Sequence, residues 1–245
     1  MRADLDRNVL VNGLSIGAGA LSAGRLRLTA TADNVANLDT PGYRAQAVEL
    51  RDTPGGGVGT FGITTDPQQG PIMSTGQPLD VALDGPGYFQ VRGSNGHVML
   101  TRDGSFRTDA NGKLVTSTGE RVVPAMTLPA GTGPAAVAIG QDGTVSANGT
   151  TLGKLSVVNV AAPAGLIAAG NGRYLPSVAS GPARPSSDAR VQQGALEGSN
   201  ADEVDSMVDL VDIRDTFAFN VKTIQVQDDI LRATLDITSP ADRSG

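Results

Sequence analysis

Both ends of the chain carry apolar residues at alternating spacings of three and four, and the middle does not. Positions at this spacing near the N-terminus are Val11, Leu14, Ala18, Leu21, Arg25, Leu28, Ala32 and Val35. Positions at this spacing near the C-terminus are Met207, Leu210, Arg214, Phe217, Val221, Ile224, Asp228, Leu231 and Leu235. This is the heptad spacing of helices that pack along an apolar seam. The pattern therefore predicts a long amphipathic helix at each end of the chain.

The two predicted helices differ in their local signals. Asn200, followed three residues later by Glu203, resembles a capping box and predicts the start of the C-terminal helix, and Pro240 marks its far limit. Four glycines fall in the N-terminal helix but outside its seam, and each costs ~1 kcal/mol relative to alanine. They are Gly13, Gly17, Gly19 and Gly24. We expect this helix to be loose alone and to be ordered by a partner. Packing of the two helices on each other within one chain is an open alternative.

The middle of the chain has the period of two that is typical of strands. Segments 80–83, 88–91, 98–101 and 152–160 are the clearest strands. Hairpin-type dipeptides, where a positive φ is needed, occur between them. These are Asn95-Gly96, Asp103-Gly104, Asn111-Gly112, Asp142-Gly143 and Asn148-Gly149. The sequence predicts an α+β fold, in which a mostly antiparallel β domain is flanked by N- and C-terminal coiled-coil-type helices.

The predicted domain boundaries follow from these patterns. Residues 1–43 are the N-terminal helix and a turn, and residues 44–77, which have little periodicity, are an extended connector. Residues 78–192 form the β domain, with a loop rich in Pro and Ser at 176–190. Residues 193–245 contain the C-terminal helix, which is expected to pack with residues 1–43.

Composition excludes several functions. The chain has 245 residues and no Cys, so disulfides, thiolate zinc sites and a Cys nucleophile are excluded. A net charge of −6 with scattered Lys and Arg argues against nucleic acid as a partner. No run approaches the ~18 apolar residues of a transmembrane helix, so membrane insertion is not expected. The glycine- and polar-rich stretch around 9–23 is a poor signal-peptide core, and we expect no cleaved signal.

Two arrangements in the sequence resemble catalytic sites, and neither fits its surroundings. Gly13-Leu-Ser15-Ile-Gly17 matches the pattern of a nucleophile elbow, and the only histidine is His97. That elbow needs a strand before the serine, whereas Ser15 lies in a helical pattern. A pair of carboxylates could serve glycoside hydrolysis, and Asp80, Asp84, Asp103 and Asp109 are available. Asp103, however, is explained by its turn with Gly104. We expect neither enzymatic activity nor a metal or other cofactor.

Several motifs resemble the flagellar axial proteins that form the rod and hook. They are Asn34-Val-Ala-Asn37-Leu-Asp-Thr-Pro41-Gly42-Tyr43, the segments 78–91 and 101–106, and Gln193-Gly-Ala-Leu-Glu-Gly-Ser-Asn200. They occur in the family's order over nearly the whole chain. One departure is the run Arg214-Asp-Thr-Phe217, where the family often has Arg-Ala-Tyr-Glu. The chain resembles the basal-body rod proteins, the proximal F-type most closely and the distal G-type second.

The resemblance implies a structural subunit of the bacterial flagellar rod that acts in motility. Its terminal helices would assemble into a helical tube that transmits torque. Expected partners are copies of itself, other rod and hook–basal-body proteins, and the flagellar type III export apparatus, and the expected location is the periplasmic basal body. The expected assembly interface comprises Leu14, Leu21, Leu28, Val35, Asn34, Asn37, Pro41, Gly42, Leu210, Phe217, Ile224 and Leu231. Asn34 and Asn37 would cap and orient the helix end, and Pro41-Gly42 would turn the chain into the connector.

A second function class fits the same sequence. A secreted β-domain binding module or adhesin would use exposed loops to bind its ligand, and its helices would pack only internally. Self-assembly separates the two hypotheses, because only the rod subunit requires it.

Overall fold

The computed structural model describes residues 2–52 and 58–238, with side chains described for 16–51 and 62–233. The chain divides into two compact units. Unit 1 consists of Met1–Val35, Gln46–Thr64 and Asp202–Gly245, and unit 2 of Ala36–Ala45 and Thr65–Ala201. The chain therefore crosses between the units four times, after Val35, Ala45, Thr64 and Ala201. The combination of terminal helices and a central antiparallel β region confirms the predicted α+β class.

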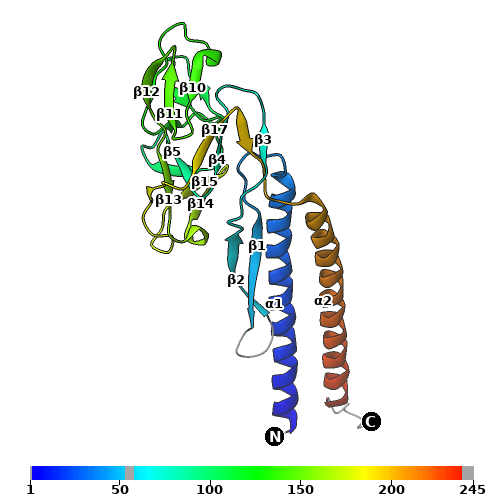
Figure 1. The fold of residues 1–245 in the computed structure, drawn as a ribbon. Helices are drawn as coiled ribbons and strands as arrows, with labels where there is room; N and C mark the ends of the chain where they lie inside the picture. The colour runs from blue at the N-terminus through cyan, green and yellow to red at the C-terminus, as the bar shows by residue number, and fades with distance from the viewer. Residues whose placement is uncertain (1, 53–57, 239–245) are drawn as a thin grey trace, which may run out of the picture. The chain divides into compact units, whose positions relative to one another are not determined.

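Unit 1 contains the two long helices and one hairpin. The helices are α1 (Arg2–Ala36) and α2 (Glu203–Thr238), and they run side by side in opposite directions (Figure 1). The hairpin pairs β1 (Gln46–Asp52) with β2 (Val58–Thr65). The segment expected to be an extended connector is thus partly folded as a hairpin. Its alternating runs, 48–51 and 61–64, are only four residues long, so the sequence analysis did not predict these strands. No helix among the described residues is long and apolar enough to span a membrane.

The start of α2 differs from the prediction. The helix begins at Glu203, and its cap is Asp202, whose carboxylate accepts a hydrogen bond from the Asp205 amide at 2.9 Å. This is the N-cap to N3 bond that satisfies an otherwise unpaired helix donor. The prediction that Asn200 caps the helix was wrong, because the Asn200 side chain makes hydrogen bonds to other backbone segments instead.

Unit 2 is built from short antiparallel strands. Its largest sheet has nine strands, with the path β14-β15-β6-β5-β9-β8-β7 and with β13 pairing both β5 and β16. The members are β5 (Tyr88–Arg92), β6 (Val98–Thr101), β7 (Arg107–Thr108), β8 (Leu114–Val115), β9 (Arg121–Val122), β13 (Val157–Asn159), β14 (Ile167–Gly170), β15 (Arg173–Leu175) and β16 (Arg184–Pro185).

Three smaller ladders complete unit 2, together with short 3-10 turns at Pro134–Ala136 and Pro163–Gly165. One is a three-stranded sheet, and the other two pair C-terminal strands with earlier ones. They are β10 (Val137–Ile139) with β11 (Thr144–Ala147) and β12 (Thr150–Lys154), β17 (Arg190–Gln193) with β4 (Val81–Asp84), and β18 (Ala195–Glu197) with β3 (Ile72–Ser74). The last two ladders close the unit by joining residues more than 100 positions apart.

The core of unit 2 is built mainly from aliphatic side chains and contains few aromatic rings. One cluster centres on Val81, Leu83, Phe89 and Val145, each with 0% exposure. Phe89 and Phe106 meet edge to face with ring centroids 5.2 Å apart. A second cluster contains Tyr88, Leu100, Val158, Val160 and Tyr174. Only 3% of the sequence is aromatic, and four of its eight Phe and Tyr rings lie in these two clusters, where each buries a large area.

Two local predictions in unit 2 were wrong in detail. The strand expected over 152–160 is split between β12 and β13. Leu155 bonds to the Gly143 carbonyl and Ser156 to the Val123 carbonyl, so the chain leaves one sheet and joins another there. Gly104 does not have a positive φ. It is needed because a Cβ there would lie 1.7 Å from the Val81 carbonyl oxygen, which no side chain tolerates.

Candidate functional site

The helix α1 ends in a tight turn made by the residues that the sequence singled out. The Asn37 side-chain oxygen accepts a hydrogen bond from the Thr40 hydroxyl at 3.0 Å, and the Tyr43 amide bonds to the Thr40 carbonyl at 3.2 Å. Pro41 is half-buried, and Gly42 is buried with φ +67°. The turn thus depends on Gly42, because L side chains rarely adopt a positive φ.

Gly42 is also pressed against another segment of unit 2. A Cβ at Gly42 would lie 2.5 Å from the Arg102 carbonyl carbon and 2.7 Å from the Asp103 nitrogen. The Gly42 amide donates to the Glu197 carbonyl at 2.8 Å. Three distant parts of the chain therefore meet at this one glycine.

A buried ionic cluster lies beside Gly42. The Glu197 carboxylate is bonded to Arg44 at 2.7 Å and to Arg102 at 3.0 Å, and none of the three residues is more than 4% exposed. Glu197 also accepts the Gly70 amide, and Arg102 donates to the Gly85 carbonyl at 2.9 Å. Burial lowers the pKa of Arg102, an effect that the Glu197 charge opposes and the Arg44 charge increases. One carboxylate thus serves two buried guanidinium groups, and the sequence analysis did not predict this cluster.

Asn200 joins the chain segments that enter and leave unit 2. Its side-chain oxygen accepts the Ala45 amide at 2.5 Å, and its amide donates to the carbonyls of Asp66, at 3.4 Å, and Gln68, at 2.9 Å. The Asp66 amide in turn bonds to the Ala45 carbonyl at 2.8 Å. We call Arg44, Arg102, Glu197 and Asn200 the junction cluster.

The predicted seam of α1 is not the face that is buried within the chain. Ala23 and Ala30, seven residues apart on one face, are 5% and 3% exposed. The seam residues Leu21 and Leu28 each lie two residues before a buried alanine, and Val35 continues the same spacing one heptad later. Two residues correspond to ~200° around a helix, so this seam lies on nearly the opposite face. Leu28 and Val35 are exposed, Leu21 is half-buried, and the Leu14 side chain lies outside the described residues.

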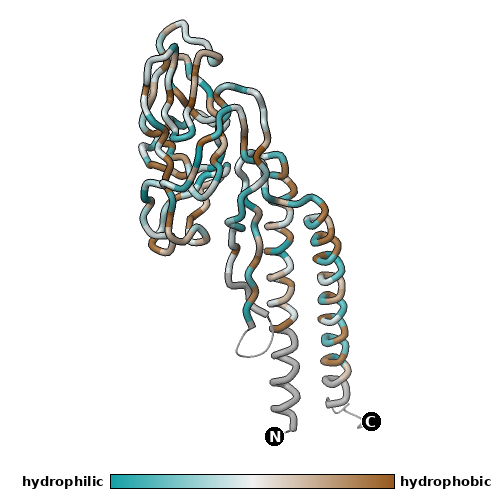
Figure 2. Tube along the Cα trace, viewed as in Figure 1, coloured by the Kyte–Doolittle hydropathy of each residue, from teal (hydrophilic) through white to brown (hydrophobic). Residues whose placement is uncertain are grey.

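On α2 the predicted seam is partly buried. Leu210, Ile224 and Leu231 are half-buried, and Phe217 is 45% exposed. The most deeply buried positions are Ser206 and Ile213, which adjoin the predicted seam. Large apolar side chains on the other side of α2 are exposed. They are Val204, Val208, Val211, Phe219 and Val226. Figure 2 shows hydrophobic and hydrophilic segments alternating along this helix.

Two contacts identify the packed faces of the helices. A Cβ at Gly17 would lie 2.9 Å from Cγ1 of Ile224, so α1 and α2 approach closely there. Arg27 and Asp209 form an ion pair at 3.4 Å across the same pair of helices. α1 and α2 therefore pack on each other within unit 1 at Gly17 and Arg27. This packing leaves Leu28 and Val35 of the α1 seam exposed.

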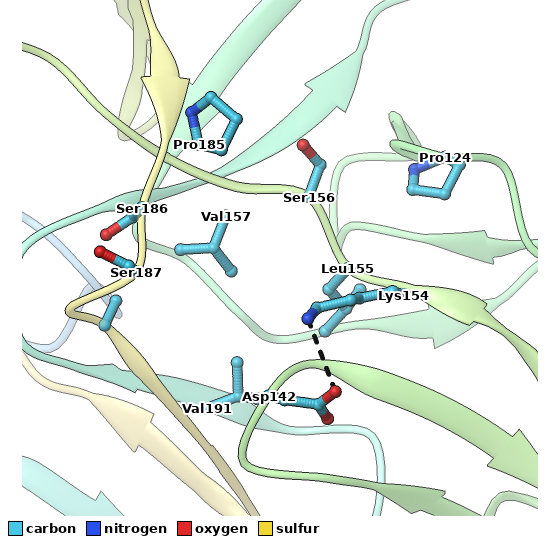
Figure 3. Close-up of a pocket in the computed structure, with 11 residues that line it drawn as sticks. Pro124, Asp142, Lys154, Leu155, Ser156, Val157, Pro185, Ser186, Ser187 and Val191 are labelled. Atoms are coloured by element: carbon cyan, nitrogen blue, oxygen red, sulfur yellow. Dashed lines mark ion pairs between the residues drawn. The ribbon is translucent and has the colours of Figure 1, made fainter.

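The pockets described in unit 2 are lined mainly by small, aliphatic and turn residues. Figure 3 shows one of about 480 Å³, lined by prolines, serines and aliphatic side chains, with the Lys154–Asp142 ion pair at its edge. Hydrogen bonds from Thr144 lower the pKa of Asp142, which holds it in the charged form. Ser15 lies inside α1 with no strand before it, and His97 is exposed in the β5–β6 loop. Among the described residues, no group of three His, Asp or Glu side chains could hold a metal ion.

Three family models match successive parts of the chain. Residues 14–44 match the flagella basal body rod protein model, and residues 82–147 match the D1 domain of the flagellar hook protein FlgE/F/G. Residues 192–237 match the C-terminal model of the flagellar basal body rod FlgEFG proteins. These ranges contain α1 from residue 14 onward with its turn, much of unit 2, and the segment from Glu197 into α2.

Curated relatives align over almost the full chain. The flagellar basal-body rod protein FlgG of Agrobacterium fabrum is 31% identical, covering 90% of this chain and 97% of the relative. FlgF of Caulobacter vibrioides is 28% identical, covering 92% of this chain and 97% of the relative. FlgF of Mesorhizobium japonicum is 30% identical, covering 84% and 89%. With these matches and the fold in agreement, the chain belongs to the flagellar basal-body rod proteins of the F/G type and is a structural subunit of that rod.

Proposed function

We propose that this protein assembles through α1 and α2 into the helical tube of the rod and that the tube transmits torque. The observation that carries the proposal is the pair of apolar stripes left exposed in the isolated chain. One stripe is the α1 seam with Leu28 and Val35, and the other is the stripe of α2 with Val208 and Phe219. Each fully buried aliphatic or aromatic side chain contributes ~1.5–3 kcal/mol. Covering several of them per subunit gives a strong contact between neighbours.

The partners follow from this geometry. Copies of the same chain and other rod and hook–basal-body proteins present related helices, and a heterologous contact of this kind extends into a tube. The proposed location is the periplasmic basal body, and the proposed route is the flagellar export apparatus without a cleaved signal. Relatives of both the F and G types match the chain. The proximal F-type position therefore stays a prediction from the sequence motifs.

The test replaces one seam residue without disturbing the packed faces. Leu28→Asp places a charge in the exposed α1 seam, and Ser22→Asp places the same charge on an exposed α1 position outside the seam. We expect Leu28→Asp to leave unit 2 folded and to abolish rod assembly and motility. Ser22→Asp should leave both intact.

The companion variants probe α2. Val208→Asp and Phe219→Asp, which place charges in the exposed stripe of α2, should also prevent assembly. Motile cells with normal rods carrying Leu28→Asp, Val208→Asp and Phe219→Asp together would refute assembly through these helices. That result would favour a binding module whose helices serve only its own fold.

A further inference from the structure

The junction cluster is an unusual way to hold a segment as short as β18. Glu197 is its last residue and pairs with Ile72 of β3, and the strand has only three residues. Its apolar content is limited to Ala195, which is buried, and Leu196, which is half-buried. So small an apolar pattern defines the register poorly, and a slip by one residue would exchange the two faces of the strand.

The charges supply what the apolar pattern lacks. Glu197 is the carboxylate that both Arg44 and Arg102 contact, and the site is almost fully buried. Buried side-chain nitrogens of the two arginines, Arg44 Nε and Nη1 and Arg102 Nε, have no hydrogen-bond partner among the described residues. A one-residue slip would leave two guanidinium groups facing Leu196 or Gly198. Each buried cation would then lose its counter-charge, which is far more costly than the loss of an apolar contact.

Stability alone does not account for such a cluster. Apolar side chains of similar volume often replace a buried ionic triad at no cost, whereas removing a single partner is strongly destabilising. A buried ionic group is best attested as a device that selects one arrangement over its neighbours. The tolerance for apolar replacement distinguishes that role from a purely stabilising one.

We propose that Glu197, with Arg44 and Arg102, is a register lock for the C-terminal segment of unit 2. In the locked register Asn200, three residues later, reaches the Ala45 amide and the Asp66 and Gln68 carbonyls. A slip by one residue would move Asn200 by ~3.3 Å along the strand direction and would break those hydrogen bonds. The lock therefore fixes the positions at which the chain leaves unit 2 after Ala45 and Ala201. The lock stands without the proposed function, and only its use in presenting the helices to neighbouring subunits rests on that function.

The test compares two variants with a surface control. Glu197→Gln leaves two buried cations unpaired, and Arg44→Met/Glu197→Leu/Arg102→Met replaces the whole triad by apolar groups. Asp142→Asn removes an ion pair whose side chains are at least 60% exposed. Urea unfolding of the full chain gives the unfolding equilibrium constant. NMR of the amides of residues 195–200, with hydrogen exchange, reports whether the segment occupies one register.

The expected results distinguish a cluster that selects one register from a cluster that only stabilises the fold. Glu197→Gln should raise the unfolding constant by roughly 10²- to 10³-fold, and Asp142→Asn should change it by less than roughly fivefold. The triple variant should stay as stable as the parent but give multiple resonances and faster exchange at 195–200. A triple variant with a single set of parent-like resonances, or one that does not fold, overturns the proposal. So does Glu197→Gln with parent-like stability.

Failure of the lock and failure of rod assembly give different results. If the lock is right and assembly is wrong, the triple variant shows several registers although the parent protein forms no rods. If assembly is right and the lock is wrong, the parent forms rods and the triple variant keeps one register.

Discussion

Asn34 holds Gln46 through both backbone groups of that residue. The Asn34 amide donates to the Gln46 carbonyl at 2.9 Å, and its oxygen accepts the Gln46 amide at 2.8 Å. The side chain therefore imitates a neighbouring strand at the start of β1, next to the last turn of α1. This is a tertiary role within the chain for a residue that the sequence analysis placed at the helix end and in the expected assembly interface.

Replacing Asn34 by alanine should free the first residue of β1. We expect faster hydrogen exchange at the Gln46 amide and a loss of roughly 1–3 kcal/mol in the unfolding free energy of unit 1, because two bonds to the backbone are lost. Asp33→Ala is a nearby comparison on the exposed side of the helix. Unchanged exchange at Gln46 in Asn34→Ala would show that the two bonds are not formed in solution.

Gly42→Ala should destabilise unit 2 much more than Gly76→Ala. Both glycines have φ near +68°, at +67° and +69°, so each substitution costs roughly 1–2 kcal/mol of backbone strain. Only Gly42 faces other backbone atoms, whereas a Cβ at Gly76 meets nothing within 4 Å. Urea unfolding of the two variants measures the difference. Equal losses would mean that the turn at Gly42 does not pack against Arg102.

The glycines of α1 should respond differently to alanine. Gly24→Ala is expected to stabilise the helix by about 1 kcal/mol, because alanine favours helix and open space surrounds that position. Gly17→Ala should gain little or nothing, because its Cβ pushes Ile224 aside. Thermal unfolding followed by helical circular dichroism tests this pair. The same gain at both positions would argue against close packing of α1 on α2.

Alkaline pH should weaken unit 2 through Tyr174. Burial raises the pKa of Tyr174 from 10.0 to about 12. Between these values the unfolded tyrosine loses its proton while the folded one keeps it, so ionisation favours unfolding. Stability that is fully present below pH 10 should fall by roughly 1.4 kcal/mol per pH unit up to about 12.

Tyr174→Phe isolates this effect. The variant keeps the ring that packs edge to face on Tyr88 at a centroid distance of 5.9 Å, and it removes the titrating hydroxyl. Its unfolding free energy should depend less steeply on pH between 10 and 12 than that of the parent. An equal slope in both proteins would show that Tyr174 titrates normally in the folded state.

Features that depend only on residues close together in the sequence were the most predictable. The heptad spacing predicted both helices, and the dipeptides at Gly96, Gly112, Gly143 and Gly149 predicted turns where φ is indeed positive. These signals are local, since the spacing or residue type alone determines which backbone conformation is accessible. The hairpin of β1 and β2 has a weaker signal, because its alternating runs are only four residues long and no Asn-Gly or Asp-Gly dipeptide joins them.

The sequence by itself determined the α+β class, the two terminal helices, the turn after α1 and the likeness to the rod family. Only the tertiary structure decided which helix faces are buried, because either side of α1 carries enough small or apolar residues to pack. It also decided the roles of Gly104, Asn200 and Glu197. Their environments are made by distant segments, such as Val81, which is 23 residues from Gly104, and Ala45, which is 155 residues from Asn200. Close approach and the pairing of buried charges depend on distances in space, and a linear pattern does not contain them.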